Sequence, residues 1–353
     1  MSRKTESRKR KHLEIMSEEE VQAKAKTTLF ENVELVHQPV SEINAEDIDL
    51  SVEIFGKKLN YPILISGMTG GHKSATKINK NLAKAAQKTG VAMGLGSQRA
   101  MLENEKLTKT YQVRDAAPDI LLIGNLGVPQ LKEFGVNGVK KAFESIEADA
   151  FAIHLNNLQE IIQVEGDTDA SSYLEEIEKI VKGTKFPIII KETGAGISKE
   201  AAKKLIDLEI TGIDIGGAGG TSWSAVEIIR DEQENLKEFW DWGIPTAASI
   251  LEVRSVSGKI PLIASGGLRT GMDIAKSIAL GADLGGLAYP FFKAAEKSSD
   301  AVVKEIEKLA ETLRNTLFLT GAKNIEELKK SETVLYGKLL DWKNSRNLKR
   351  KAF

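Results

Sequence analysis

Residues 261–271 read PLIASGGLRTG, an apolar run that ends in two glycines just before a helix is expected to begin. Glycine lets the backbone approach a bound group closely, and backbone N–H groups beside a helix N-terminus attract anions. The next apolar run, DLGGLAY (283–289), also contains a double glycine. Loops after the seventh and eighth strands of an eight-stranded α/β barrel commonly hold phosphates. The alternative is that these glycines only make tight turns.

Apolar runs like this one recur along the chain and alternate with amphipathic segments. Each run is continuously apolar, which is typical of parallel strands that are covered on both faces. The stretches between them leave room for one crossover helix each. The runs expected to be strands are YPILIS (61–66), VAMGLG (91–96), DILLIGN (119–125), DAFAIHL (149–155), FPIIIKE (186–192), GIDIGG (212–217), PLIASGG (261–267) and DLGGLAY (283–289).

Helical periodicity is clearest at 74–88, at 198–208, which begins after the N-cap candidate Ser198, and at 300–319. Two further segments interrupt the alternation. Residues 50–60 predict a short hairpin that turns at Gly56. Residues 224–245 form a charged and aromatic insertion, which we expect to be a lid or an oligomer contact.

Almost every expected strand ends in small or polar residues. Active-site residues of (β/α)₈ barrels come from the carboxyl ends of many strands, whereas an open doubly wound sheet gathers them at one switch point. The fold class is therefore predicted to be α/β, with one (β/α)₈ TIM barrel over 61–320. An N-terminal extension (1–60) and a C-terminal helical and basic tail (321–353) would flank it.

The composition narrows the class of protein. The 353 residues include 49 basic and 50 acidic side chains and no cysteine, which excludes disulfides and thiolate metal sites. The balanced charge argues against a nucleic-acid partner. No apolar run is long enough to span a membrane, and the basic first residues lack the apolar core of a signal peptide. A cytoplasmic protein is expected, with solvated basic ends at 8–11 and 349–351.

Lys191 follows four apolar residues at the end of an expected strand. A buried ammonium is costly unless it meets a negative charge. Three interpretations remain open: a cation beside the N1 and O2 edge of a reduced flavin, a Schiff-base lysine, or a structural ion pair with an acid such as Asp214.

The segment HLNNLQE (154–160) places several polar side chains at another strand end. A core histidine alone would not explain this density of functional groups. Glu160 is a candidate Mg²⁺ ligand, because Mg²⁺ prefers few carboxylates together with substrate phosphates. Arg99, in GLGSQR (94–99), would suit a phosphate or diphosphate.

Together these stretches resemble the type 2 isopentenyl-diphosphate isomerases, over roughly residues 8–320 and in the same order along the chain. The matching pieces are RKRKHL (8–13), ISGMTGG (65–71), GLGSQR (94–99), IGNLG (123–127), HLNNLQE (154–160), VEGDTDA (164–170), IIIKETGAGIS (188–198), GGAGGTSW (216–223), ASGGLRTG (264–271) and LGADLGGLAYP (280–290). Two features depart from the family pattern: Asn157 stands where proline or alanine is usual, and the stretch GGAGGTSW (216–223) lacks the more common serine and arginine around its glycines.

The resemblance implies an enzyme of isoprenoid biosynthesis that interconverts isopentenyl and dimethylallyl diphosphate. It implies reduced FMN, Mg²⁺ and NADPH as reductant, and a tetramer or octamer. Catalytic roles are implied for His154, Gln159 and Glu160, with Glu160 also holding the metal. The residues implied to bind FMN are Gly67, Met68, Thr69, Ser97, Asn125, Lys191, Thr221, Gly267, Leu268, Arg269, Ala288 and Tyr289. Those implied to bind substrate are Arg8, Lys9, Ser97, Gln98, Arg99 and Gln159.

The resemblance also gives the basic N-terminal cluster a role. We expect it to order when diphosphate binds and to reach its own or a neighbouring subunit's site. Two alternatives are an FMN-dependent oxidoreductase of the 2-hydroxy-acid oxidase type, with His154 as base, and a non-catalytic flavin- or phosphate-binding protein. Arg8, Lys9 and Glu160 would be surplus in the first.

Overall fold

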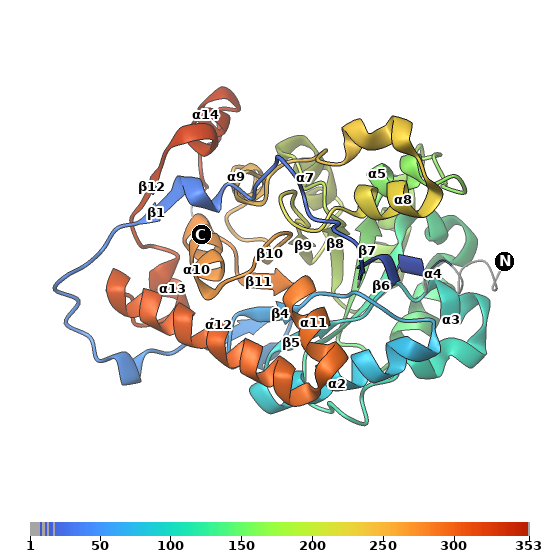
Figure 1. Ribbon diagram of the computed structural model, residues 1–353, viewed down its shortest axis with the longest axis horizontal. Coiled ribbons are helices and arrows are strands. Elements are labelled where there is room, and N and C mark those ends of the chain that lie inside the picture. Colours follow the sequence, from blue (N-terminus) through green and yellow to red (C-terminus); the bar gives the residue numbers. More distant parts are fainter. Residues whose placement is uncertain (1–7, 9–10, 13, 17, 352–353) are drawn as a thin grey trace.

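The computed structural model describes residues 8, 11–12, 14–16 and 18–351. Eight parallel strands pair side by side and close into a barrel (Figure 1), which confirms the predicted (β/α)₈ architecture. Seven of the eight expected apolar runs contain one of these strands, and the eighth strand, β6, continues two residues past its expected run at 119–125. In chain order the strands are β4 (Ile63–Ile65), β5 (Ala92–Gly94), β6 (Leu122–Gly127), β7 (Ala150–Leu155), β8 (Ile188–Glu192), β9 (Gly212–Asp214), β10 (Leu262–Ser265) and β11 (Leu284–Leu287).

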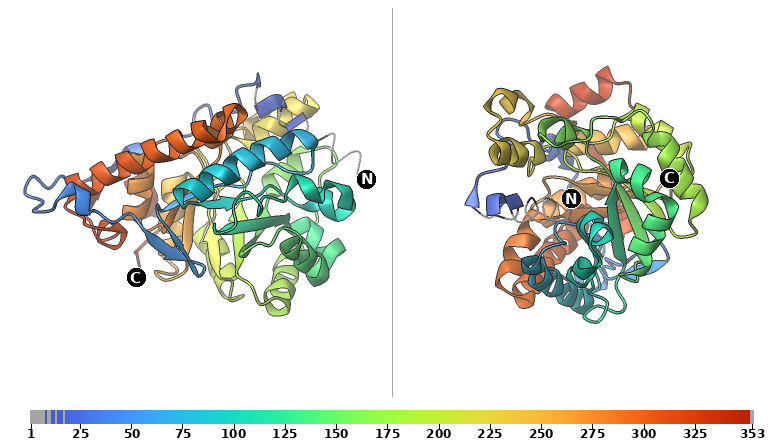
Figure 2. Two further views of the ribbon diagram at one scale, coloured as in Figure 1. Left: turned by 90° about the horizontal axis from the view of Figure 1, so that it is seen from below. Right: turned by 90° about the vertical axis from the view of Figure 1, so that its right-hand side faces the viewer.

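Helices surround the barrel (Figure 2). Those that follow the strands along its outside are α2 (Lys73–Thr89), α4 (Leu131–Glu144), α6 (Tyr173–Gly183), α7 (Lys199–Ile206), α9 (Thr246–Arg254), α10 (Gly271–Leu280) and α12 (Ser299–Thr320). The helices predicted from periodicity are confirmed within two residues at each end. The Ser198 side chain caps α7 by accepting the N–H of Ala201, as expected.

Shorter helices stand at the carboxyl ends of the strands or connect other elements. They are η3 (Glu105–Thr110), η4 (Val128–Gln130), α3 (Arg99–Glu103), α5 (Asn157–Ile162), α8 (Trp223–Asp231), η5 (Glu234–Phe239) and α11 (Tyr289–Lys297). The insertion expected at 224–245 therefore folds as α8 and η5. None of the helices among the described residues is both long and apolar enough to cross a bilayer.

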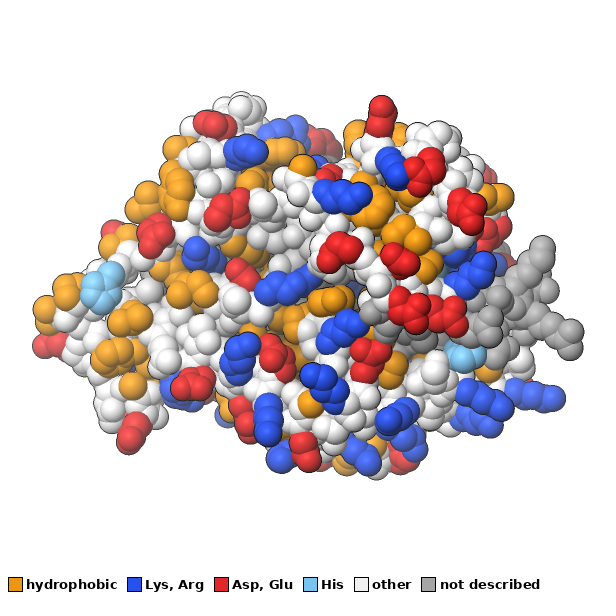
Figure 3. Space-filling view, viewed as in Figure 1, with side chains coloured by type: hydrophobic (Ala, Val, Ile, Leu, Met, Phe, Trp, Pro, Cys, Tyr) orange, Lys and Arg blue, Asp and Glu red, His pale blue; other side chains and the backbone are white. Residues whose placement is uncertain are grey.

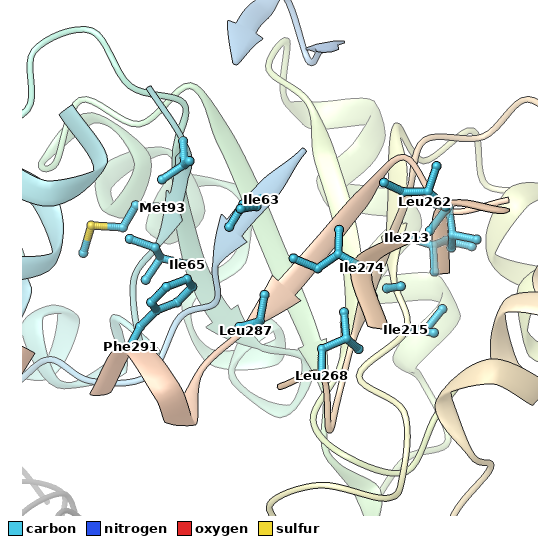
Figure 4. Close-up of a cluster of buried hydrophobic side chains, with 14 of the residues drawn as sticks. Ile63, Ile65, Met93, Ile213, Ile215, Leu262, Leu268, Ile274, Leu287 and Phe291 are labelled. Atoms are coloured by element: carbon cyan, nitrogen blue, oxygen red, sulfur yellow. The ribbon is translucent and has the colours of Figure 1, made fainter. Parts of the chain in front are cut away.

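Alternate residues of a barrel strand serve two separate cores. Ile63 and Ile65 of β4 point outward into the layer between strands and helices, where Phe291 also packs (Figure 4). Leu64, between them, belongs to a second cluster that fills the barrel interior. Because both faces are buried, the strand reads as a continuous apolar run and not as an alternating one.

The predicted hairpin closes the amino-terminal end of the barrel. Strands β2 (Val52–Ile54) and β3 (Lys57–Leu59) pair antiparallel, and Gly56 makes the turn with a φ of 76°. Ile54 and Leu59 join the interior cluster. The hairpin thus acts as an apolar plug, so the cavity that the described residues form opens at the opposite end of the barrel.

Two strands that are far apart in the sequence pair on the outside of the barrel. Strand β1 (Val33–Leu35) pairs antiparallel with β12 (Thr333–Leu335). The remaining terminal helices are η1 (Phe30–Asn32), η2 (Ala45–Asp47), α13 (Ile325–Leu328) and α14 (Gly337–Ser345). The expectation of a solvated tail at 349–351 is wrong for Arg350. Its guanidinium donates to the carbonyls of Ala279 and Lys329, both at 3.0 Å.

Basic side chains are unevenly spread over the surface. In the view of Figure 3, Lys and Arg gather along the lower part, where α2, α11 and α12 lie. The formal net charge of the whole chain is only −1, so this cationic region is local.

A fully buried arginine braces the start of β10. Arg254 donates from Nε to the carbonyl of Gly281 at 2.7 Å and from Nη1 to that of Ile260 at 2.7 Å. Its Nη2 lies 3.0 Å from Oδ2 of Asp283, which also accepts the N–H of Leu262. The other carboxylate oxygen of Asp283 pairs with Lys329.

The same arrangement occurs at the start of β6. Arg114 donates to the carbonyl of Ile120 at 3.0 Å and lies 2.8 Å from Oδ2 of Asp149. That oxygen also accepts the N–H of Leu122, and Oδ1 of Asp149 pairs with Lys57. Strands β6 and β10 are four positions apart in the eight-stranded barrel, so the two braces lie on opposite sides of its base.

Replacing Arg254 by methionine should destabilise the protein strongly. The change removes one of the two cationic partners of Asp283 and takes the guanidinium donors from the carbonyls of Ser257, Ile260 and Gly281. Breaking a buried pair in this way typically costs about 3–5 kcal/mol. Urea unfolding should show this loss. Lys182→Met, which breaks an exposed pair with Glu178 on α6, is the control and should cost less than about 1 kcal/mol. Equal effects of the two variants would contradict a bracing role for Arg254.

Candidate active site

The carboxyl ends of the barrel strands open into one cavity, which holds about 1510 Å³ of empty space including its open mouth. Every strand, or the turn directly after it, contributes to the lining, as expected from the polar strand ends. The contributions are Gly67 after β4, Ser97 after β5, Asn125 in β6, His154 in β7, Lys191 in β8, Gly216 after β9, Ser265 in β10 and Leu287 in β11.

Most of the site residues singled out in the sequence line this cavity. Besides the strand-end residues above, they are Arg8, Met68, Thr69, Arg99, Gln159, Glu160, Thr221, Gly267, Leu268, Arg269, Ala288 and Tyr289. Lys9 lies outside the described residues. Gln98 is the exception and is described below.

Glycines allow two loops to pack backbone against backbone at one side of the cavity. A Cβ on Gly220 would lie 2.4 Å from the backbone of Gly267, and one on Gly266 would lie 2.0 Å from the carbonyl of Gly217. Arg269 lies beside these loops, with Nη2 2.6 Å from Oε1 of Gln22. Burial lowers the pKa of Arg269, partly offset by Tyr289 and Asp273.

The helix after the double glycine is less open to an anion than its sequence suggested. Thr270 and Asp273 form a capping box at the start of α10. The Asp273 carboxylate accepts the backbone N–H groups of Arg269 and Thr270, both at 2.9 Å. By contrast, the N-cap of α11, Ala288, provides no side-chain cap. An anion at this side of the cavity would therefore meet the N-terminus of α11 in place of α10.

A buried ion pair forms the floor of the cavity. Lys191 Nζ lies 3.2 Å from Oδ2 of Asp214, and the hydroxyl of Ser265 donates to Oδ1 of the same carboxylate. The ion pair considered for Lys191 is thus present, and Lys191 still lines the cavity.

Neutral donors surround Glu160, which is 8% exposed. Its carboxylate accepts from Nδ2 of Asn156 at 2.6 Å, from Nε2 of Gln163 at 2.5 Å and from the N–H of Asp167 at 2.8 Å. The loop that supplies Asp167 comes so close that a Cβ on Gly166 would lie 1.8 Å from the carbonyl of Glu160.

No three His, Cys, Asp or Glu side chains of the described residues gather as a metal site. Glu160 is instead a single carboxylate on the cavity wall. One carboxylate suits a Mg²⁺ ion that takes its remaining ligands from substrate phosphates and water.

The N-terminal segment lies across the cavity of its own chain. Arg8 Nη1 is 3.2 Å from Oε1 of Gln163, and His12 Nε2 is 3.1 Å from Oε1 of Glu227 on α8. Met16 packs with apolar residues of α5 and α8 in a small separate core. Helix α8 therefore contacts the N-terminal segment beside the cavity.

Glu227 is fully buried and connects three elements. Besides its ion pair with His12, Glu227 accepts a hydrogen bond from Nε2 of Gln159 at 2.5 Å and pairs with Nε of Arg230 at 3.0 Å. Burial alone would raise the pKa of Glu227, but the hydrogen bond from His12 and the charges of His12 and Arg230 hold it below its usual range. The carboxylate therefore stays ionised and orients the Gln159 amide.

Gln98 does not line the cavity, contrary to its implied role in substrate binding. Its side chain is fully buried. Oε1 accepts the backbone N–H of Asn125 at 3.0 Å, and Nε2 donates to the carbonyl of Ala142 at 2.7 Å. The oxygen and the nitrogen of the amide both make hydrogen bonds inside the protein, so Gln98 cannot reach a ligand without breaking these bonds.

The sequence-based list missed Glu227, His12 and Trp223. Trp223 lines the cavity, and the His12 ring packs edge-on against the Trp223 ring with 5.5 Å between the ring centroids. Glu227 in turn contacts His12. A signal was available, because Trp223, Glu227 and Arg230 lie on one face of a helix at spacings of four and three.

Removing the negative charge of Glu227 should loosen the N-terminal segment. Glu227→Gln loses one charge-assisted contact with His12, worth about 1.5–3 kcal/mol, which corresponds to roughly 10- to 100-fold faster amide exchange. Hydrogen exchange of residues 18–25 measures this. Glu238→Gln, an exposed change in the same insertion, should leave the exchange unchanged. Unaltered protection in Glu227→Gln would refute this role of Glu227.

The carboxyl of Glu192, at the end of β8, should make stability depend on pH. Burial raises its pKa to about 7, against the hydrogen bonds that it accepts from the N–H groups of residues 193–195. Between its ordinary value of 4.5 and about 7, the folded state holds a proton that the unfolded state has lost. The free energy of unfolding should therefore fall as pH rises through this range.

Urea unfolding of wild type and Glu192→Gln at several pH values tests this. The variant should gain stability relative to wild type from pH 4.5 to about 7, and the difference should then level off. Parallel pH curves for the two proteins would show that the Glu192 carboxyl does not titrate in this range.

Comparison with known proteins agrees with this site. The family model described as FMN-dependent dehydrogenase matches residues 1–116 and 154–335. Isopentenyl-diphosphate delta-isomerase of Archaeoglobus fulgidus is 47% identical, over 96% of this chain and 98% of its own. That of Methanothermobacter thermautotrophicus is also 47% identical, over 98% of both.

Among solved structures, a mandelate oxidase that carries an FMN adduct matches with a TM-score of 0.63 and 17% identity, over 88% of this chain and 90% of its own. That likeness is one of fold alone. The relatives of high identity and nearly full coverage establish that the chain belongs to the family of isopentenyl-diphosphate delta-isomerases.

Proposed function

We propose that this enzyme interconverts isopentenyl diphosphate and dimethylallyl diphosphate by a 1,3-proton shift, with reduced FMN in the barrel mouth. The observation that carries this proposal is that residues able to bind anions line the cavity in two groups. One lies at the ends of β10 and β11, and the other at β5, β7 and the N-terminal segment. A phosphorylated flavin would occupy the first, which leaves the second for a diphosphate.

The first group fits the FMN phosphate. The glycine contacts between the 217–220 and 266–267 backbones leave no room for side chains, so a ligand can approach the main chain there. Arg269 supplies a guanidinium, and Ala288 and Tyr289 place the uncapped N-terminus of α11 beside it. Gly267, Leu268, Arg269, Ala288 and Tyr289 would hold the phosphate.

The remaining residues with an implied flavin role line the cavity between this group and the floor. They are Gly67, Met68, Thr69, Ser97, Asn125, Lys191 and Thr221. Ser66 adds to the fit: its hydroxyl is buried in the lining and has no hydrogen-bond partner among the described residues. When bound, reduced FMN supplies an electron-rich surface and an acid/base group.

The second group would clamp the diphosphate. Arg8, Arg99 and His154 present cationic or donor groups to the cavity, and Glu160 would hold Mg²⁺ against the phosphate oxygens. Lys9, which lies outside the described residues, would join them. Because Arg8 contacts Gln163 of its own chain, we propose that the N-terminal segment acts in cis.

Gln159 is placed to act near the alkene. Its Nε2 donates to Glu227, so the amide carbonyl is the end that can face the cavity, whose lining includes Gln159. The reaction adds a proton to the terminal carbon and removes one from C2, so cationic character develops on the carbon between them. A carbonyl dipole near that carbon would stabilise the charge, and the surrounding wall would fix the alkene in one orientation.

Two alternatives predict different observations. A 2-hydroxy-acid oxidoreductase would use His154 as base but would need neither Arg8 nor a carboxylate held as Glu160 is. A flavin-binding protein without activity would tolerate changes at Gln159 and Glu160. The three donors that hold the buried Glu160 carboxylate, and the bond to Glu227 that orients the Gln159 amide at the cavity, support a catalytic site over both alternatives.

The isomerase assignment carries further expectations. We propose NADPH as the reductant, a cytoplasmic location in isoprenoid biosynthesis, and a homo-oligomer of four or eight subunits. We also propose that the barrel (61–320) is the catalytic unit, and that the extension before it completes the site.

Anaerobic incubation with reduced FMN, Mg²⁺ and isopentenyl diphosphate should give dimethylallyl diphosphate. The product is measured by chromatography, with lactate in place of the diphosphate as a parallel reaction. Lactate should not reduce oxidised flavin in this protein. Failure to form product, together with flavin reduction by lactate, would reject the isomerase in favour of the oxidoreductase.

Glu160→Gln should lower kcat/KM by roughly 10- to 100-fold and raise the Mg²⁺ concentration needed for half-maximal rate. The reason is that an amide is a poorer Mg²⁺ ligand than a carboxylate. Asp169→Asn, on the exposed part of the same loop, is the matched control and should retain the wild-type rate. Equal activity of the two variants would contradict metal binding at Glu160.

A further inference from the structure

We infer that Asn125 and Gln98 are positioning residues that determine which ring nitrogen of His154 carries the proton. The inference deepens the proposed function, because His154 stands among the groups assigned to the diphosphate. It also gives a role to Gln98, whose buried side chain does not reach the substrate cavity.

The orientation of the Asn125 amide is the first step. Its Nδ2 lies 3.2 Å from the backbone carbonyl of Leu95, and its Oδ1 lies 2.7 Å from Nδ1 of His154. A carbonyl oxygen can only accept a hydrogen bond. The amide nitrogen must therefore face Leu95, and the flipped amide would place two carbonyl oxygens against each other.

The protonation of the His154 ring follows from this orientation. Because Oδ1 of Asn125 can only accept, Nδ1 of His154 must donate and so carries a proton. In the neutral ring, Nε2 is then the nitrogen that bears a lone pair. Neutral His154 can accept a hydrogen bond at Nε2 but cannot donate one there.

Gln98 fixes the position of Asn125 from behind. Its Oε1 accepts the N–H of Asn125 at 3.0 Å, and its own backbone N–H donates to the carbonyl of Asn125 at 2.8 Å. The Gln98 side chain is anchored in turn on the carbonyl of Ala142. A residue outside the cavity thus holds both sides of the Asn125 peptide.

This arrangement has a consequence for an anionic ligand. A phosphate oxygen only accepts hydrogen bonds unless it is protonated, so it meets a donor at Nε2 of His154 only when the ring is cationic. The other charged or titratable side chains that line the cavity among the described residues are Arg8, His12, Arg99, Glu160, Lys191, Arg269 and Tyr289. Asn125 therefore makes His154 a group that binds the diphosphate through charge and hydrogen bond together.

Magic-angle-spinning NMR of the full-length protein labelled with ¹⁵N-histidine tests the inference directly. The chain has four histidines, and His154→Gln identifies the signals of His154 by their loss. In the neutral ring of wild type, the protonated nitrogen should be Nδ1. A neutral ring protonated at Nε2 would overturn the inference. This readout needs no activity, so it is independent of whether the proposed reaction occurs.

Gln98→Met tests the role of Gln98, because methionine fills a similar volume without the hydrogen bonds. The variant should show a mixture of the two neutral forms of His154, and its KM for isopentenyl diphosphate should rise by up to roughly 100-fold. Inorganic diphosphate, as an inhibitor, should weaken in parallel.

Gln87→Met is the matched control. Gln87 accepts the N–H of Asp119 and donates to its carboxylate, just before the opposite end of β6. It should change neither the His154 signals nor KM. If Gln98→Met leaves the Nδ1 proton of His154 and KM as they are in Gln87→Met, Gln98 is not a positioning residue.

Discussion

Closure of the parallel barrel is the constraint on which this site depends. Eight parallel strands that pair in a ring must all end at the same rim, so residues far apart in the chain come together there. Lys191, Asp214 and Ser265 come from three strands and form one bonded group. The apolar plug formed by β2 and β3 closes the other end, which makes the rim the only route for a ligand into the barrel among the described residues.

Charges inside this molecule are compensated locally. The carboxylate of Glu227 has no exposure, yet His12, Arg230 and Gln159 all bind it. An isolated buried carboxylate would cost far more than any single contact returns. The same contacts that compensate this charge also hold the N-terminal segment over the cavity and orient Gln159. Stability and site geometry therefore share their interactions.

The sequence was sufficient for the fold and for most of the cavity lining, because apolar runs and polar strand ends are local patterns. It was insufficient wherever the role of a residue depends on which way its side chain points in the folded protein. Gln98 and Arg99 are neighbours in one motif, but Arg99 lines the cavity while Gln98 points into the interior. Likewise, Asp273 caps α10 and takes the N–H groups that the double glycine had seemed to leave for a phosphate. Both outcomes depend on tertiary contacts that spacing alone does not specify.

The two arginine braces at the base of the barrel have a broader consequence. Arg114 with Asp149 and Arg254 with Asp283 repeat one pattern of contacts half a turn apart, although no repeat is evident along the chain. None of these four residues lines the cavity. The contacts that hold the starts of β6 and β10 are therefore separate from the side chains of the site. Side chains at the rim can therefore change without loss of the contacts that stabilise the base.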